Sequence, residues 1–268
     1  MKFFNGCTAL ITGASAGLGT EFARQLAPYA DTLVLVARRN DRLELLRAEL
    51  TESFPHLRVR PYAADLSQDG ARAEFIRWLG EQQIEVDVLI NNAGLGDRGE
   101  FATSEWDKVR RILEVNISAL THLTHALVPG MIARGRAAIL NVSSVAGFFP
   151  LPNFAVYAAT KAYVTSLTEA LRMELRPKGI AVTALCPGPV PTEFFDIATR
   201  GGSDTPHYDS MPAFTATPQE VVYTALRALA TDRARVIPNP LLAVAVGAAL
   251  LIPFFIVRRV LAASSHRI

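Results

Sequence analysis

Residues 7–19, with the sequence CTALITGASAGLG, decide which fold the chain is predicted to adopt. Residues 7–11 are an apolar run typical of a buried strand, and a glycine-rich turn, TGASAGLG, follows at residues 12–19. Apolar side chains then recur at helical spacing, at Leu18, Phe22 and Leu26. Strand, glycine-rich turn and helix in this order form a phosphate-binding unit, because the glycines let the backbone approach a pyrophosphate. The spacing G-x-x-x-G-x-G differs from the usual G-x-G-x-x-G, and a simple tight turn is the alternative.

The rest of the chain repeats this alternation of strand and helix. Apolar runs predict further strands at 32–37, 57–62, 86–90, 137–142, 180–185 and 235–237. Helical patterns lie between them, at 40–54, 71–79, 104–133 and 154–176. Strands separated by helices imply a parallel sheet that is covered on both faces by right-handed crossovers. We therefore predict an α/β fold: a Rossmann-like doubly wound parallel sheet of about seven strands in a single domain, followed by an apolar C-terminal tail.

Composition and charge exclude several classes of function. Of the 268 residues, 50% are hydrophobic, and the formal net charge is only +2, so no basic surface for nucleic acid is expected. The two cysteines, Cys7 and Cys186, lie far apart in apolar runs and indicate neither a disulfide nor a metal site. The amino terminus leads directly into the first strand and leaves no room for a cleavable signal segment. We expect a cytoplasmic protein that binds no metal.

The end of the second predicted strand bears on the choice of cofactor. In dinucleotide-binding folds, an acidic residue at this position binds the ribose 2′-hydroxyl of NAD. Here the strand ends at Ala37 and continues into Arg38 and Arg39. Two guanidinium groups can hold a 2′-phosphate, and no carboxylate is present to repel it. The sequence thus favours NADP(H); the alternative is that both arginines are simply solvated at the start of a loop.

A tyrosine and a lysine stand four residues apart in the helical segment 154–176. Tyr157 and Lys161 share one face of this helix, with two small alanines between them. An unperturbed tyrosine has a pKa of about 10, and a neighbouring ammonium group lowers it. The pair can therefore act as a general acid/base near neutral pH. The alternative is an ordinary solvated helix face.

Small and polar residues follow the ends of other strands, where ligands bind in open α/β sheets. The fourth strand closes into NNAG at 91–94, and the sixth closes into a segment rich in proline and glycine at 186–192. Asn116 lies within the long predicted helix, where asparagine is unfavourable, so it is either a local kink or a functional amide.

Together these features resemble the short-chain dehydrogenases/reductases. The resemblance covers about residues 5–195 and rests on TGASAGLG at 12–19, NNAG at 91–94, Asn116, Ser144, Tyr157-x-x-x-Lys161 and PGPVPT at 187–192. The glycine spacing and the modest length are similar to the shorter branch of that family, and differ from the epimerase-type branch. The resemblance implies an NADP(H)-dependent oxidoreductase that interconverts a carbonyl and an alcohol, with residues 1–240 as the catalytic domain.

The resemblance also implies roles for individual residues. Tyr157 would exchange a proton with the substrate oxygen, Ser144 would hydrogen-bond the carbonyl, and Lys161 would lower the pKa of Tyr157 and hold the nicotinamide ribose. Asn116 would join Lys161 through water in a proton relay. The other expected cofactor contacts are Gly13, Ser15, Gly17, Leu18 and Gly19 at the pyrophosphate and adenosine ribose, Asp65 and Leu66 at the adenine, Asn92 near the adenosine half, Val190 and Thr192 at the nicotinamide carboxamide, and Pro187 and Gly188.

Residues 193–216, which follow the sixth strand, are predicted to form a lid over a small-molecule substrate. Apolar side chains in this lid and before Tyr157 favour a hydrophobic or lipid-like substrate; they are Phe194, Phe195, Met211 and Phe214, with Phe148, Phe149 and Leu151. Gly201-Gly202 is a candidate hinge, and a surface loop with a few core anchors is the alternative. The sequence Thr217-Pro218-Gln219-Glu220 then predicts the capped start of a helix.

The C-terminal tail, residues 241–268, contains seventeen residues without a charge at 241–257, followed by Arg258 and Arg259. Three arrangements stay open: a membrane-inserted or re-entrant segment at the inner membrane face, a segment buried against the substrate site or in an oligomer interface, and a complete bilayer span. The long helices around Asn116 and Tyr157 also suggest a homo-oligomer surface. The alternative function is a non-catalytic NADP-binding protein for regulation or assembly, which would not need an activated phenol.

Overall fold

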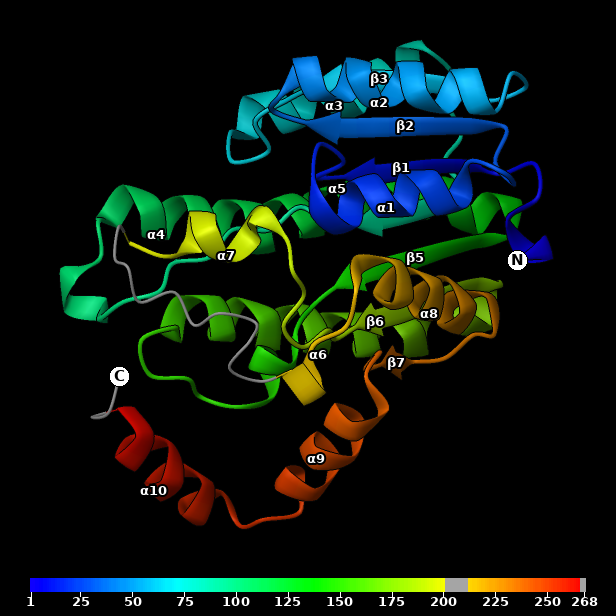
Figure 1. The fold of residues 1–268 in the computed structure, drawn as a ribbon. Helices are drawn as coiled ribbons and strands as arrows, with labels where there is room; N and C mark the ends of the chain where they lie inside the picture. The colour runs from blue at the N-terminus through cyan, green and yellow to red at the C-terminus, as the bar shows by residue number, and fades with distance from the viewer. Residues whose placement is uncertain (201–211, 266–268) are drawn as a thin grey trace.

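The computed structural model describes residues 1–200 and 212–265, and these residues form a seven-stranded sheet (Figure 1). The strands are β1 (Thr8–Thr12), β2 (Thr32–Ala37), β3 (Arg58–Ala63), β4 (Val88–Asn91), β5 (Ala137–Val142), β6 (Ile180–Leu185) and β7 (Arg235–Val236). All neighbours pair in parallel, in the order β3-β2-β1-β4-β5-β6-β7. The connections run outward from β1 in both directions, which makes the sheet doubly wound. The predicted Rossmann-like α/β fold is confirmed.

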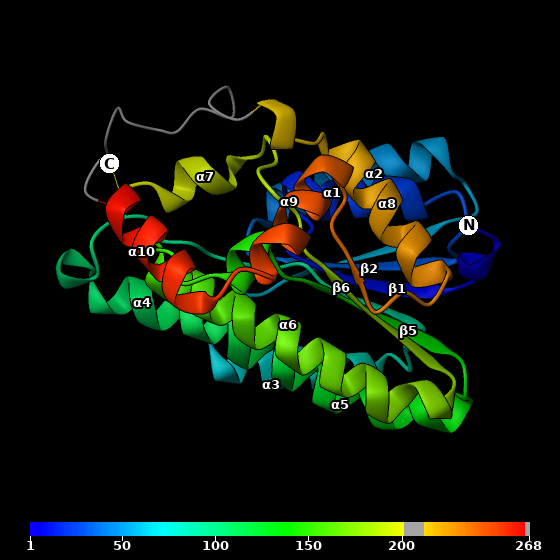
Figure 2. The ribbon, with the colours of Figure 1, turned by 90° about the horizontal axis from the view of Figure 1, so that it is seen from below.

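Helices cover both faces of this sheet (Figure 2). One layer consists of α1 (Gly17–Leu26), α2 (Asn40–Ser53) and α8 (Pro218–Ala230), which share one hydrophobic cluster with the sheet. The opposite layer contains α3 (Asp69–Glu81), α5 (Leu120–Arg134) and α6 (Ala155–Leu175), which share a second cluster. Because both faces are covered, every residue of β2 is buried, and this explains its uninterrupted apolar sequence. A short helix, α7 (Glu193–Ala198), follows β6.

The long helix expected over residues 104–133 is divided in the structure. It consists of α4 (Trp106–Leu113) and α5, joined by a π-helical turn, Glu114–Ala119, that contains Asn116. The Asn116 carboxamide donates to the Leu95 carbonyl and to the Thr160 hydroxyl, each at 2.9 Å, and accepts from the Leu95 amide at 2.8 Å. A π-helical turn of this kind is rare, and the apolar periodicity of residues 104–133 does not predict it. The asparagine is the one sequence signal for this irregularity.

The apolar run 241–257 is interrupted in the structure. It forms α9 (Pro240–Leu250) and α10 (Phe254–Ser265), with Pro253 between the two helices. Within the described residues, no helix combines the length and the apolar character that crossing a bilayer requires. Upstream, α8 begins with the predicted capping box, in which Thr217 and Glu220 each bond the other's backbone amide.

One side of α9 packs against the rest of the chain. Leu242 and Val246 are buried, whereas Leu241 and Val244 on the same helix are exposed. The helix is capped by Asn239, whose side chain accepts a hydrogen bond from the Leu242 amide at 2.9 Å and donates one to the Ala213 carbonyl at 3.0 Å. This packing agrees with the alternative in which the tail is buried against the substrate site, although only for one side of α9.

Candidate active site

A cavity of about 550 Å³ lies at the carboxyl ends of the strands, where ligands bind in doubly wound sheets. Most of the predicted site residues line it: Gly13, Ser15, Gly17, Leu18, Arg38, Arg39, Asp65, Leu66, Asn92, Ser144, Tyr157, Lys161, Pro187, Gly188, Val190 and Thr192. Two predicted residues do not line it, Gly19 and Asn116. The fold therefore brings the segments that follow strands β1 to β6 together around one cavity.

The glycine-rich turn depends on three glycines in two different ways. Gly13 and Gly17 have positive φ angles of 68° and 54°, which side chains rarely adopt. Gly19 has no such angle, but a Cβ atom there would lie 2.1 Å from the Gly13 carbonyl oxygen. Gly19 therefore permits the close packing of α1 on the turn. The predicted cofactor contact at Gly19 stays a prediction.

Hydrogen bonds fasten the turn to the loop after β4. Asn92 donates from Nδ2 to the Thr12 carbonyl at 2.9 Å, while Thr12 Oγ1 accepts from the Asn92 and Ala93 amides at 3.0 Å each. A Cβ atom on Gly13 would lie 2.9 Å from both Asn92 Nδ2 and Ala93 Cα. Asn92 thus holds the glycine-rich turn in place in addition to lining the cavity.

The two predicted arginines both line the cavity after β2, but one of them already has a partner. Arg39 donates from Nε to Ser15 Oγ at 3.3 Å, and its Nη1 lies 3.0 Å from Glu193 Oε2. Glu193 also contacts Arg42 Nη1 at 2.6 Å, and the hydrogen bonds from Arg42 and Arg39 lower the pKa of the Glu193 carboxyl. This contact was not predicted from the sequence, because Glu193 is separated from Arg39 by 154 positions.

Tyr157 lies inside the cavity under two aromatic rings. The ring centroid of Phe154 is 4.4 Å from that of Tyr157, and the centroid of Phe194 is 5.3 Å away. Burial raises the pKa of Tyr157 to about 12, and a hydrogen bond with Ser144 opposes this rise. At neutral pH the phenol is therefore protonated, which is the state needed to donate a proton to a carbonyl oxygen.

Lys161 is buried beside Tyr157. Its Nζ donates to the Val142 carbonyl at 2.8 Å and lies 5.5 Å from the centroid of the Tyr157 ring. Burial lowers the pKa of Lys161 to about 8. In this structure burial is the largest influence on the pKa of the phenol, and the predicted role of Lys161 in lowering that pKa stays a prediction.

The two serines after β5 have different surroundings. Ser144 lines the cavity, hydrogen-bonds Tyr157 and accepts a hydrogen bond from the Ala146 amide at 3.1 Å. Ser143 donates to the Lys161 carbonyl at 2.8 Å and shares a hydrogen bond of 2.7 Å with the Thr165 hydroxyl. Ser144 is therefore the serine that can reach a substrate oxygen held near Tyr157, which is the role predicted for it.

Asn116 lies close to Lys161 without a direct bond to it. A Cβ atom on Gly94 would be 3.4 Å from Lys161 Nζ and 3.6 Å from Asn116 Oδ1, so Gly94 lies against both side chains. The Asn116 carboxamide is itself occupied by Leu95 and Thr160. Asn116 thus positions the loop after β4, and the predicted water-mediated relay to Lys161 stays a prediction.

The remaining lining of the cavity is largely apolar. It comes from the segment before α6, from α7 and from α9: Phe149, Leu151, Phe154, Phe194, Phe195, Ile197, Leu242 and Val246. Two of the predicted aromatic residues lie elsewhere, since Phe148 packs under the Arg235 guanidinium at 5.0 Å and Phe214 does not line the cavity. Met211 and the Gly201-Gly202 hinge lie outside the described residues.

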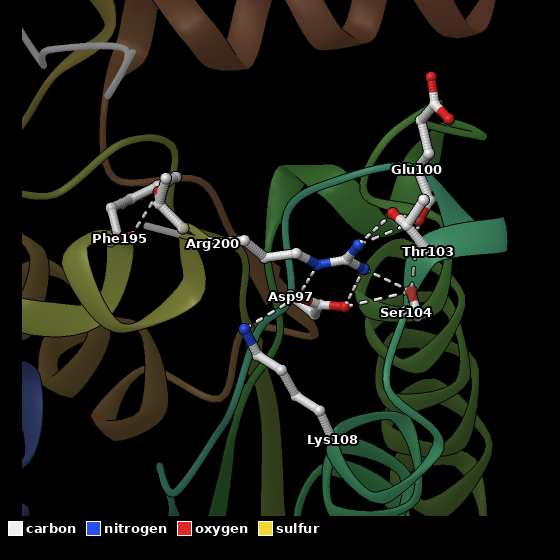
Figure 3. A network of polar contacts seen from close by, with 8 residues as sticks. Asp97, Glu100, Thr103, Ser104, Lys108, Phe195 and Arg200 are labelled. Atoms are coloured by element: carbon white, nitrogen blue, oxygen red, sulfur yellow. Dashed lines mark hydrogen bonds and ion pairs between the residues drawn. The ribbon is translucent and has the colours of Figure 1, made fainter. Parts of the chain in front are cut away.

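An ion-pair network holds the segment after α7 against the loop that follows β4 (Figure 3). Asp97, whose side chain is only 4% exposed, accepts hydrogen bonds from Arg200 and pairs with Lys108 Nζ at 2.9 Å. Arg200 also bonds the hydroxyls of Thr103 and Ser104. The hydrogen bonds from Arg200 lower the pKa of Asp97 to about 2. This network, which the sequence analysis missed, anchors the helix that carries Phe194.

The short chain dehydrogenase family matches residues 7–200 of the chain. A very-long-chain 3-oxoacyl-CoA reductase-like protein of Arabidopsis thaliana is 34% identical over 218 residues, which is 80% of this chain and 67% of that protein. The family match includes the glycine-rich turn and extends across most of the cavity.

Two solved structures resemble the whole fold. A short-chain dehydrogenase from Sphingobium yanoikuyae in complex with NADPH has a TM-score of 0.78 and 32% identity, and the match covers 92% of this chain and 96% of the other. A short-chain dehydrogenase/reductase from Burkholderia phymatum in complex with NAD has a TM-score of 0.80 and 26% identity, with 92% and 93% covered. These similar structures therefore include complexes with either nicotinamide cofactor.

Proposed function

The chain belongs to the short-chain dehydrogenase/reductase family of oxidoreductases, and we propose that it interconverts a carbonyl and an alcohol with NADP(H), acting on a hydrophobic or lipid-like substrate. The observation that carries this proposal is the single cavity of about 550 Å³ that the glycine-rich turn, Arg38 and Tyr157 line together. A nucleotide held by the turn and a substrate held at Tyr157 would share that space.

The proposed proton chemistry belongs to three side chains. When bound, the nicotinamide cofactor supplies the hydride. In the direction of reduction, the protonated phenol of Tyr157 donates its proton to the substrate oxygen, and Ser144 Oγ donates a hydrogen bond to the same oxygen. The ammonium group of Lys161, 5.5 Å from the ring centroid, stabilises the phenolate that remains.

The assignment of NADP(H) rests on the residues after β2. The glycine-rich turn at the start of α1 favours the binding of a pyrophosphate. Arg38 and Arg39, which line the same cavity, can bind the 2′-phosphate of NADP(H). The similar structure with NAD makes that cofactor the competing candidate. Dissociation constants for NADPH and NADH, measured by titration of cofactor fluorescence, test the assignment, because NADP(H) use requires a clearly lower constant for NADPH.

The proposed substrate class rests on the apolar residues around Tyr157. Three separate segments supply them: Phe149 before α6, Phe194 from α7 and Leu242 from α9. The direct test is NADPH oxidation with a panel of ketones and aldehydes that runs from small polar compounds to long-chain compounds, where activity is expected to increase with apolar size. Silence across the panel with tight NADPH binding would instead favour the non-catalytic NADP-binding alternative.

The role of Tyr157 is tested with Tyr157→Phe. We expect this variant to lose carbonyl reduction by about a hundred- to ten-thousand-fold, because the proton donor is gone while the ring remains. Binding of NADPH is expected to stay nearly intact. Near-normal turnover by the variant would remove Tyr157 from the mechanism.

We also propose that the outer side of the tail contacts an anionic membrane surface on the cytoplasmic side. Leu241, Val244, Leu251 and Phe255 are exposed, Arg258 and Arg259 are exposed beside them, and no acidic residue follows Asp232 in the sequence. Apolar side chains with basic neighbours suit an interface with anionic lipids.

Sedimentation with phospholipid vesicles tests the membrane contact. The unmodified chain is expected to bind anionic vesicles more tightly than zwitterionic ones, and Leu251→Glu is expected to weaken that binding. Leu45→Glu is the matched control, because Leu45 is 70% exposed on α2, away from the tail. Equal binding by all three proteins would contradict the proposal. Self-association through α5 and α6 stays a prediction that sedimentation equilibrium can test.

A further inference from the structure

The carboxylate of Glu193 lies where the proposed cofactor phosphate would bind. Glu193 lines the same cavity as Ser15, Arg38 and Arg39. Its Oε2 is 3.0 Å from Arg39 Nη1, and its Oε1 is 2.6 Å from Arg42 Nη1. The Nε of Arg39 is directed to Ser15 at 3.3 Å. The one carboxylate in this group is therefore bound to one of the two guanidinium groups assigned to the 2′-phosphate.

The two assigned arginines consequently differ in charge balance. Among the residues that the structure describes, Arg38 interacts electrostatically with Asp65 but forms no ion pair within 4 Å, whereas Arg39 is paired with Glu193 at 3.0 Å. The side chains of Arg39 and Glu193 are 36% and 44% exposed, so the pair is partly solvated and can be exchanged for another anion at modest cost. A phosphate and a carboxylate both use the planar fork of donors on a guanidinium group, so they compete for it.

We propose that Glu193 sets the cofactor preference of this enzyme by competing with the 2′-phosphate of NADP(H) for Arg39. The inference rests on the proposed NADP(H) site at Arg38 and Arg39. The 2′-phosphate of NADP(H) must either displace Glu193 from Arg39 or share Arg39 with it. In the second case the phosphate and the carboxylate repel each other at one guanidinium group. NAD(H) has no 2′-phosphate and leaves the Arg39–Glu193 pair intact. The carboxylate therefore weakens the binding of one cofactor and not of the other.

The first test compares the two cofactors in Glu193→Gln, which removes the charge and keeps the shape of the side chain. The dissociation constant for NADPH is expected to fall about three- to tenfold, because the phosphate no longer has to replace an exposed ion pair at Arg39. The dissociation constant for NADH is expected to change by less than about twofold, because NADH has no 2′-phosphate that competes with Glu193 for Arg39. An unchanged or higher constant for NADPH overturns the proposal.

A matched control separates the local effect from a general change in charge. Glu49 pairs with Arg24 at 2.7 Å and is 46% exposed, so it resembles Glu193, but it does not line the cavity. Glu49→Gln removes the same charge at a distance and is expected to leave both constants unchanged. If Glu49→Gln tightens NADPH as much as Glu193→Gln does, the effect is a general one and competition at Arg39 is refuted.

A double-mutant cycle with Arg39→Gln distinguishes this inference from the proposed function. Arg39→Gln is expected to weaken NADPH about tenfold and to spare NADH. In that background Glu193→Gln should bring no further gain, because the contested cation is absent. If Arg39→Gln leaves NADPH binding unchanged, the proposed NADP(H) site itself fails. If Arg39→Gln weakens NADPH binding but Glu193→Gln does not strengthen it, only the competition fails.

Discussion

The two ends of the cavity are built in different ways. At the nucleotide end, the backbone of the turn after β1 packs on the loop after β4, and the contacts are made by Gly13, Gly19 and the Asn92 amide. At the substrate end, side chains from distant segments meet, and Asp97 and Arg200 hold them together through ion pairs (Figure 3). The nucleotide end thus depends on close packing of the backbone, and the substrate end depends on the charge and packing of side chains.

This difference predicts how each end responds to substitution. A Cβ atom on Gly19 would lie 2.1 Å from the Gly13 carbonyl oxygen, which leaves no room for any side chain, so the nucleotide end should tolerate almost no change at Gly19. An ion pair or an apolar lining residue can be altered while the sheet stays folded, so the substrate end should change in activity before it changes in fold.

The largest effect is expected for Gly19→Ala at the nucleotide end. The new methyl group would overlap the Gly13 carbonyl, so the free energy of unfolding, measured in urea, should fall by roughly 3 kcal/mol. Gly80→Ala is the matched control, because Gly80 lies in α3 with open space around it and should gain about 0.5–1 kcal/mol. Equal effects of the two substitutions would contradict the packing role of Gly19.

A smaller effect is expected for Asp97→Asn at the substrate end. Arg200 and Lys108 would lose a buried anionic partner, and because both cations are partly exposed the loss should be about 2 kcal/mol. The KM for the carbonyl substrate should rise while the dissociation constant for NADPH stays unchanged. Asp107→Asn serves as the control, since Asp107 is 81% exposed in its pair with Arg110. Weaker NADPH binding in Asp97→Asn would show that the two ends are coupled.

Leu242→Ala should alter substrate preference without altering the fold at the nucleotide end. Leu242 lines the cavity, and a Cβ atom on Gly188 would lie 2.3 Å from its Cδ2. Shortening it should lower kcat/KM for small ketones by about five- to tenfold and affect bulky ketones less, because bulky substrates refill the space. Val244→Ala, on the exposed side of the same helix, should change neither value. Identical behaviour of the two variants would remove α9 from the substrate site.

The smallest effect concerns acid stability. The pKa of Asp97 is about 2 in the folded chain, below its ordinary value of 3.8. Its charged form therefore stabilises the fold above about pH 3.8, and this contribution is lost as the pH falls towards 2. The difference in unfolding free energy between the unmodified chain and Asp97→Asn should shrink over that range. A difference that is independent of pH would contradict the assigned ion pair.

Much of the site can be predicted because its determinants are local. Tyr157 and Lys161 are neighbours through helical spacing, and the glycine-rich turn follows its strand directly, so both can be recognised in the sequence. Asn116 marked the irregular helix for the same reason. The raised pKa of Tyr157 could not be predicted, because it depends on how deeply the folded chain buries the phenol.

Other features were decided only by the tertiary structure. Glu193 reaches Arg39 across 154 positions, and Arg200 reaches Asp97 across 103. The periodicity of the sequence does not predict such pairs, because the neighbours of each residue do not indicate its distant partner. Likewise, the apolar composition of residues 241–257 does not say which side of α9 faces Gly188 and which side is exposed.

By itself the sequence determined the order of the elements along the chain, which is an alternation of apolar runs and helices. It also determined a turn that only glycine can form and a tyrosine–lysine pair on one helix face. These follow from short-range sterics and from the period of each element, which are properties of neighbouring residues. The tertiary structure alone decided the pKa values, the carboxylate on Arg39 and the closure of the cavity by α7 and α9. These depend on burial and on long-range contacts, which exist only once the sheet has brought distant segments together.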